Sequence, residues 1–247
     1  MNNKPIKSFS CGNLCFALFY FLSGAVIDVC FSDDELCDPS DPYKDRADAG
    51  FVNAQLDYAF RLTYGVEVRQ DIVAAANYFK KAADEGDAYG EYHYGYCLEL
   101  GIGVDLDLAE AASYYKRSAD NGCALGGYNY GYCLEHGKGV DVDLSAAANY
   151  YKKSAEQGNA YGQYHYGYCL ENGLGVAKDP AAAVEYYRKS ASQRNPFGEY
   201  SYASCLELGT GGCEVNLADA AIFYKRADNH GVKGARNRFY SVFTKIK

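Results

Sequence analysis

The sequence predicts an all-α fold, a right-handed α-solenoid of about five 36-residue helix-turn-helix repeats. One observation is that Cys97, Cys133, Cys169 and Cys205 lie 36 residues apart. A second is that the first three of them fall in one string, Y-x-Y-G-Y-C-L-E-x-G-x-G-V, and that a block such as AASYYKRSADNG follows each string. A fixed period of this length is typical of stacked helical hairpins, because one hairpin cannot bury both of its faces alone.

The repeat period divides the chain into units and flanking segments. The units cover residues 51–86, 87–122, 123–158, 159–194 and 195–231, so that 51–231 is the predicted repeat region. The fifth unit carries one extra residue near Gly212 and Cys213. Residues 32–50 read as a degenerate partial repeat, and 232–247 as a C-terminal capping helix with a basic outer side.

Each unit is expected to contain a helix A, a glycine-containing loop and a helix B. In the second unit, helix A is predicted from Ala88 to Leu100. Gly101 and Gly103 then end it, because glycine adopts the positive φ that turns the chain out of a helix. Asp107 is a suitable N-cap for helix B, since its side chain can accept hydrogen bonds from first-turn amides. The same place is held in the other units by Asp71, Asp143, Asp179 and Asn216.

Small residues inside helix A indicate close packing between helices. Gly95, Gly131 and Gly167 occupy one position in three units, although a glycine inside a helix costs ~1 kcal/mol relative to alanine. We therefore expect a neighbouring helix to pack too close for a side chain there. The repeated cysteines are expected to be buried and unpaired, because copies on separate helices about 10 Å apart are beyond disulfide reach.

Composition and motifs argue against several functions. The net charge of −8 disfavours nucleic acid as a partner, because phosphate backbones attract positively charged proteins. Four histidines do not cluster in the sequence, and no C-x-x-C, Walker loop, G-x-S-x-G or H-E-x-x-H motif occurs. The sequence therefore predicts no catalytic residue, metal site or cofactor, and it disfavours an enzyme.

One side of helix A carries tyrosine and histidine in the second, third and fourth units, and Phe197 and Ser201 stand at the corresponding places of the fifth. At about 100° per residue, this arc points away from the glycine-bearing packing positions. We predict that it lines a concave, partner-binding surface, and the alternative is that its aromatic residues pack between helices. The predicted binding residues are Tyr89, His93, Tyr96, Leu125, Asn129, Tyr132, His136, Tyr161, His165, Tyr168, Asn172, Phe197 and Ser201.

The segment from Gly90 to Gly122 resembles the Sel-one-like repeats, a family related to tetratricopeptide repeats. Gly95, Val104 and Asp107 match the family pattern, and Leu98 stands where the family has tyrosine. The resemblance implies adaptor work, that is, a scaffold that binds a protein or peptide. One bacterial branch has cysteine pairs and a link to β-lactam binding, which should not be carried over because each unit here lacks the second cysteine.

The predicted function is thus a protein–protein interaction scaffold that binds on the concave helix A side. The acidic net charge favours a partner that is basic or of mixed charge. The alternative is a secreted or envelope-associated protein that binds a carbohydrate or peptidoglycan-like ligand, since tyrosine rings stack well on sugars.

The first residues leave three interpretations open. Residues 1–31 contain Lys4 and Lys7 before an apolar run from Leu14 to Ile27, and Ala25 could precede a cleavage site. This pattern fits a signal peptide, a hydrophobic segment that caps the solenoid, or a short membrane segment. A signal peptide over residues 1–25 would direct the chain to the secretory pathway or outside the cell, whereas a capping segment would leave it in the cytoplasm.

Overall fold

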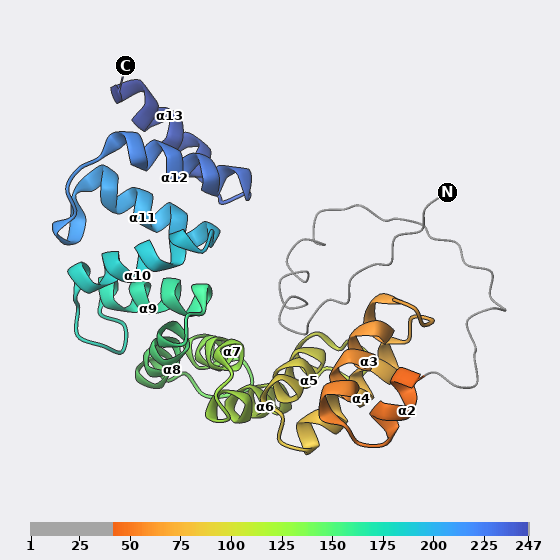
Figure 1. The fold of residues 1–247 in the computed structure, drawn as a ribbon. Helices are drawn as coiled ribbons and strands as arrows, with labels where there is room; N and C mark the ends of the chain where they lie inside the picture. The colour runs from red at the N-terminus through yellow and green to blue at the C-terminus, as the bar shows by residue number, and fades with distance from the viewer. Residues whose placement is uncertain (1–41, 247) are drawn as a thin grey trace, which may run out of the picture. The chain divides into compact units, whose positions relative to one another are not determined.

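The computed structural model describes residues 42–246, and over this range all regular secondary structure is helical (Figure 1). The helices are α2 (Pro42–Asp48), α3 (Val52–Tyr64), α4 (Ile72–Asp84), α5 (Ala88–Leu100), α6 (Leu108–Asp120), α7 (Ala124–His136), α8 (Leu144–Glu156), α9 (Ala160–Asn172), α10 (Pro180–Ser192), α11 (Pro196–Leu208), α12 (Leu217–Asn229) and α13 (Ala235–Ile246). The predicted right-handed α-solenoid is confirmed. The segment 1–31 and the first part of 32–50 lie outside the described residues.

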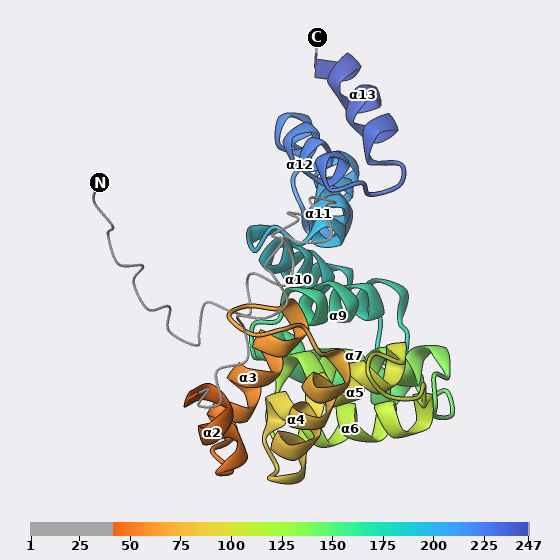
Figure 2. The ribbon, with the colours of Figure 1, turned by 90° about the vertical axis from the view of Figure 1, so that its right-hand side faces the viewer.

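Five helical hairpins form the solenoid. Helices α3, α5, α7, α9 and α11 are the copies of helix A, and α4, α6, α8, α10 and α12 are the copies of helix B. Each helix packs on the next one along the chain, from α2 on α3 to α12 on α13, and Figure 2 shows the same succession from the side. The extra residue of the fifth unit falls near a 3₁₀ turn, Thr210–Gly212, which lengthens the loop between α11 and α12.

The predicted caps fix where helix B begins. The side chain of Asp107 accepts a hydrogen bond from the Glu110 amide at 2.9 Å. The corresponding bonds of Asp71, Asp143, Asp179 and Asn216 measure between 2.9 and 3.1 Å. In the loop before Asp107, Gly103 has a φ of +71°, and a Cβ on it would collide with the backbone carbonyl of Ile72. Each loop is thus pressed against helix B of the unit before it.

The helix A glycines lie where helix B packs closest. A Cβ built on Gly131 would lie 2.9 Å from the ring of Tyr151, and the one on Gly95 would lie 3.1 Å from the ring of Tyr115. This confirms the steric reason inferred for the repeated glycine. Among the described residues, all cysteines are free, and the four repeated ones are buried.

Helix A lies on the inner side of the solenoid. The pairs α5 with α7, α7 with α9 and α9 with α11 contact one another, whereas no two helix B copies among the described helices pack to a comparable extent. Helix A copies are therefore the ones that approach across units. At the C-terminus, α13 packs on α12 and buries Ala235 and Val242. Over residues 42–246, no helix is both long and apolar enough to cross a bilayer.

Candidate functional site

Three positions of helix A form an aromatic surface, which we call the inner face. Its residues are Tyr89, Leu125, Tyr161 and Phe197 at the second position of the helix, Tyr92, Tyr128 and Tyr164 at the fifth, and Tyr96, Tyr132 and Tyr168 at the ninth. Tyr89 is 49% exposed, Tyr96 39%, Tyr168 40% and Phe197 46%, and the other members are half-buried. The inner face therefore offers large aromatic side chains to solvent on successive units.

Ring contacts join the inner face across units. The ring centroids of Tyr128 on α7 and Tyr161 on α9 are 5.4 Å apart. Those of Tyr164 on α9 and Phe197 on α11 are 5.5 Å apart, and the two rings stack. Within α9, Tyr164 also approaches Tyr168 at 6.5 Å. The aromatic residues thus serve both interpretations of the sequence, because they pack between units and still expose one side.

The sixth position of helix A lies beneath the inner face. His93 is buried, and its ring lies 4.8 Å from Phe60 and 5.0 Å from Phe79. His165 stacks at 4.8 Å on Tyr151 of the preceding unit. Burial lowers the pKa of His93 to about 3 and that of His165 to about 4, so both rings are neutral at pH 7. The expectation that His93 lies on an accessible surface is wrong, because helices of the neighbouring unit cover it.

The remaining predicted residues lie at the sixth position or at the end of helix A. Asn129 and Ser201, which share the sixth position with the two histidines, are half-buried. His136 is exposed and stacks on Tyr132 at 4.1 Å. Asn172 is exposed, and its side-chain amide donates to the carbonyl of Tyr168 at 2.9 Å. His136 and Asn172 therefore border the inner face without being covered.

A row of tyrosine–glutamate pairs, which the sequence analysis missed, runs beneath the inner face. In each pair, the tyrosine at the eighth position of helix B is buried, and its hydroxyl donates to the carboxylate of the glutamate at the twelfth position of helix A. The pairs are Tyr115–Glu99 at 2.7 Å, Tyr151–Glu135 at 2.6 Å, Tyr187–Glu171 at 2.7 Å and Tyr224–Glu207 at 3.1 Å. Burial raises the pKa of each tyrosine, which keeps its hydroxyl protonated as a donor.

The first unit lacks both partners of the pair. Phe79 stands where the other units have the paired tyrosine, and Thr63 stands where they have the glutamate. Thr63 instead donates its hydroxyl to the Ala59 carbonyl at 2.8 Å. Both groups change together because either one alone would leave a buried polar atom without its partner. The 36-residue recurrence of glutamate and its joint loss with tyrosine was the available sequence signal.

The glutamates of these pairs differ in what else they contact. Glu99 also accepts from Lys138 of the next unit at 3.3 Å, and its side chain is 19% exposed. Glu207 is almost fully buried between Arg238 and Lys245 of α13, each at 3.1 Å. For Glu171, the tyrosine hydroxyl is the hydrogen-bond partner that the described residues provide. A row of carboxylates therefore lies beneath the inner face. Glu99 and Glu207 are paired with cations, whereas Glu171 can accept a further hydrogen bond.

The chemical groups at the inner face are suited to binding a ligand. No group of three or more His, Cys, Asp or Glu within residues 42–246 is placed to hold a metal ion. Burial raises the pKa of the Cys97 and Cys133 thiols to about 11 and that of Cys169 to about 12, which makes them poor nucleophiles at neutral pH. What the site does offer is aromatic area, hydroxyl groups and carboxylates in a repeating register.

Solved structures of other proteins share this architecture. The chain is similar to a protective antigen present in uropathogenic Escherichia coli strains, with 28% identity, a TM-score of 0.71, and coverage of 80% of this chain and 42% of the antigen. It is also similar to a Sel1 repeat protein from Oxalobacter formigenes, with 25% identity, a TM-score of 0.71, and coverage of 78% and 77%. The chain thus spans less than half of the antigen's length. No curated protein matches it significantly.

The repeats themselves match one family along most of the described chain. The Sel1 repeat model matches residues 52–87, 88–123, 128–159, 160–195 and 196–231. Four of these ranges begin one residue after the units read from the cysteine spacing, and the third begins five residues after its unit, inside α7. Proteins of this kind generally mediate protein–protein interactions and are typically scaffolds without catalytic activity. The chain belongs to the Sel1 repeat family.

Proposed function

We propose that the chain is a protein-binding scaffold that captures an extended segment of a partner protein along the inner face. The observation that carries the proposal is the row of partly exposed tyrosines on helix A, repeated in register from α5 to α9 and continued by Phe197 on α11. Tyrosine contributes a large apolar ring and a polar hydroxyl, a combination enriched at protein interfaces. A linear partner could repeat its contacts from one unit to the next.

Charge favours a partner with lysine or arginine side chains. The chain carries a net charge of −8, and Glu99 and Glu135 lie beneath the tyrosines with side chains that are 19% and 18% exposed. Glu99 already pairs with Lys138 at 3.3 Å, whereas a cationic side chain that reaches Glu135 would meet a carboxylate whose hydrogen-bond donor is the Tyr151 hydroxyl. Such charge-assisted hydrogen bonds are about twice as strong as neutral ones.

The alternative ligand, a carbohydrate or peptidoglycan-like polymer, has weaker support. Sugars stack on free ring faces, whereas Tyr164 and Phe197 already stack on each other and Tyr132 is covered by His136. The E. coli neighbour is a protective antigen, but the chain covers only 42% of it. We therefore favour a polypeptide, and the experiment below includes a glycan array as its second arm.

The test compares two triple variants of the full chain. In the first, Tyr96, Tyr132 and Tyr168 of the inner face are replaced by serine. In the matched control, Leu106, Val142 and Val215 are replaced by serine; these are exposed apolar residues on the loops between helix A and helix B. Both variants lose three apolar side chains, so that only the location differs. Each is presented to a peptide library selected on the wild-type chain, and to the glycan array.

We expect the tyrosine variant to stay folded and to lose the selected peptides, while the control keeps them. Because the three tyrosines are partly exposed, their removal should cost far less stability than the loss of a buried aromatic residue. Retention of peptide binding by the tyrosine variant would refute the proposal. Global unfolding of that variant would instead show that the inner face is part of the core. If the wild-type chain and the control bind a glycan and the tyrosine variant does not, the alternative ligand is favoured.

A further inference from the structure

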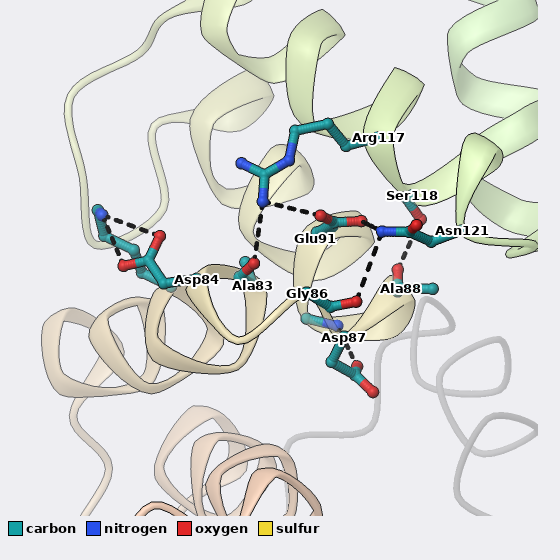
Figure 3. Close-up of polar contacts among 11 residues, drawn as sticks. Ala83, Asp84, Gly86, Asp87, Ala88, Glu91, Arg117, Ser118 and Asn121 are labelled. Carbon is teal, nitrogen blue, oxygen red and sulfur yellow. Dashed lines mark hydrogen bonds and ion pairs between the residues drawn. The ribbon is translucent and has the colours of Figure 1, made fainter.

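A polar clamp closes the edge of the second unit (Figure 3). Glu91, at the fourth position of α5, is 1% exposed. Its carboxylate accepts from Arg117 on α6 at 2.9 Å and from the side-chain amide of Asn121 just after α6 at 2.9 Å. A buried carboxylate is stable only when such donors replace the water it has lost. The clamp thus consists of one acceptor from helix A and two donors from the end of helix B.

Two other units place an oxygen-bearing side chain at the same position of helix A, each with a single contact to the end of helix B. In the fourth unit, Gln163 replaces the glutamate, and Gln193 donates to its side-chain oxygen at 2.8 Å. In the fifth unit, Glu199 is 1% exposed and lies 3.9 Å from Arg226. The second, fourth and fifth units therefore all carry an oxygen-bearing side chain at this position of helix A, and a cation from helix B lies beside it in the second and fifth.

The third unit keeps the donors and lacks the acceptor. Gly127 occupies the position of Glu91, while Lys153 and Gln157 occupy those of Arg117 and Asn121. A hollow of about 220 Å³ lies here, with Gly127, Lys153 and Gln157 in its lining. Within residues 42–246, the Lys153 ammonium contacts the Tyr150 ring at 5.3 Å but has no ion pair, and the side-chain amide of Gln157 has no hydrogen bond.

Close packing does not require glycine at position 127. A Cβ there would lie 3.5 Å from Ser154, which is an ordinary contact, whereas one on Gly126 or Gly131 would collide with its neighbours. The helix A residue 127 is also not among the residues with positive φ. A glycine inside a helix costs ~1 kcal/mol relative to alanine. Close packing therefore does not explain Gly127. What the missing side chain does provide is space, because Gly127 lines the hollow.

A second acceptor is missing from the same edge. Asp87, Asn159 and Asn195 cap helix A in other units by accepting from the amide three residues later. Cys123 stands at this place in the third unit, is buried, and makes no capping bond. The first-turn amides of α7 thus lack a side-chain acceptor at the edge of a hollow that also contains a cation. Both features favour a negative charge there.

We propose that the hollow beside Gly127 binds a carboxylate on a short aliphatic stem, as in a glutamate side chain presented by a partner polypeptide. The bound group takes the place that Glu91 fills in the second unit, with Lys153 and Gln157 as its donors. None of the residues lining the hollow belongs to the inner face, so that this site is separate from the proposed peptide surface. Glu156 also lines the hollow, and its pairing with Lys152 at 3.8 Å limits the repulsion it exerts.

The test follows the backbone amides of Gly127 and Gln157 by two-dimensional NMR of the full chain. Propionate represents a free small carboxylate, and the capped peptide acetyl-Gly-Glu-Gly-amide represents a polypeptide source. Acetyl-Gly-Gln-Gly-amide is the uncharged control, and sodium chloride at equal ionic strength controls for salt. We expect saturable shifts at these two amides with both carboxylates, and at least about fivefold weaker binding of the glutamine peptide.

Two variants make the test specific. Gly127→Glu supplies the carboxylate within the chain and should abolish the propionate shifts while the rest of the spectrum is retained. Lys153→Met keeps an apolar stem on Tyr150 but removes the charge, and should weaken propionate binding several-fold. Binding that is unchanged in either variant, or shifts that do not saturate in the wild-type chain, would overturn the proposal. Saturable shifts with propionate but not with the glutamate peptide would limit the ligand to free acids.

A gain-of-site variant gives an independent check. Gln163→Gly should open an equivalent hollow in the fourth unit beside Lys189 and Gln193. We expect a second set of saturable propionate shifts, now at residues 163 and 193, with those at Gly127 unchanged. If this variant folds and shows no second set, the reasoning from one unit to another is wrong.

Discussion

The tyrosine–glutamate pairs predict a strong and mutual dependence of two residues. We consider Tyr151→Phe, Glu135→Thr and the double variant, which recreates in the third unit the Phe79 and Thr63 combination of the first. Tyr151 is fully buried, and its hydroxyl donates to Glu135 at 2.6 Å. The first unit folds with phenylalanine and threonine at these places, so that the double variant is compatible with the repeat.

The magnitude follows from what each single variant leaves behind. Tyr151→Phe removes a hydrogen bond to a charged group and should cost about 1.5–3 kcal/mol of unfolding free energy. Glu135→Thr leaves the buried hydroxyl of Tyr151 without an acceptor, at about 1–3 kcal/mol. The double variant loses one interaction rather than two, so it should be destabilised by less than the sum, with a coupling energy of about 1–2 kcal/mol.

Urea unfolding of the four proteins, followed by far-UV circular dichroism, measures this coupling. The matched control is the same cycle with Tyr150→Phe in place of Tyr151→Phe, since Tyr150 is half-buried and its hydroxyl contacts Asp120 rather than Glu135. We expect that control to show no coupling beyond error. Additive effects for Tyr151 and Glu135 would refute the view that the pair acts as a unit.

Three further predictions concern packing, pH and thiol reactivity. Gly131→Ala should destabilise the chain by about 1 kcal/mol, because its Cβ meets the Tyr151 ring at 2.9 Å. Gly127→Ala should instead stabilise the chain by about 0.5–1 kcal/mol, because its Cβ has room. Thermal unfolding that shows both variants stabilised, or both destabilised, would contradict this. Because burial lowers the pKa of His165 from 6.5 to about 4, the unfolded chain binds a proton that the folded chain does not, and stability is lost as pH falls through this interval. Between these two pKa values, the free energy of unfolding should fall with pH by ~1.4 kcal/mol per pH unit less in His165→Asn than in the wild-type chain. Urea titrations that show the same pH dependence in both proteins would count against it. The thiol of Cys169, buried and with its pKa raised to about 12, should resist alkylation until urea unfolds the chain, and rapid labelling in buffer would contradict its burial.

The repeating features were the ones that sequence could predict. Asp107 and Asn216 cap their helices as expected, because capping depends on residues only three apart in the chain. Gly95 indicates that helix B packs close to helix A. A glycine inside a helix lowers stability, so its recurrence at one position of the repeat points to a steric cause. Such local rules apply to each unit separately, and a prediction made for one unit is supported when the same residues recur in the others.

Contacts between units were harder to predict. A helical projection places His93 and Tyr96 on one arc, but it says nothing about how closely the preceding unit packs. Phe60 and Phe79 of that unit cover His93, whereas Tyr96 stays partly exposed. The pairing of Tyr115 with Glu99 was missed for a similar reason, since it depends on how two helices meet.

The residues that depart from the repeat could not be interpreted without the structure. Gly127 and Cys123 break the pattern at one edge, and only the structure shows that both changes open the same hollow. In the sequence alone, each is a single departure from the repeat, with glycine in place of glutamate or glutamine and cysteine in place of aspartate or asparagine. The surviving donors, Lys153 and Gln157, become meaningful once the clamp around Glu91 is known.

The most direct measurement of the proposed function is a tyrosine nitration footprint with a peptide selected on the wild-type chain. In the free chain, Tyr89, Tyr96 and Tyr168 on the inner face and Tyr240 on α13 are exposed and should all be nitrated. The account predicts that bound peptide protects the first three and leaves Tyr240 reactive. Protection of Tyr240 with continued nitration of Tyr96 and Tyr168 would contradict it.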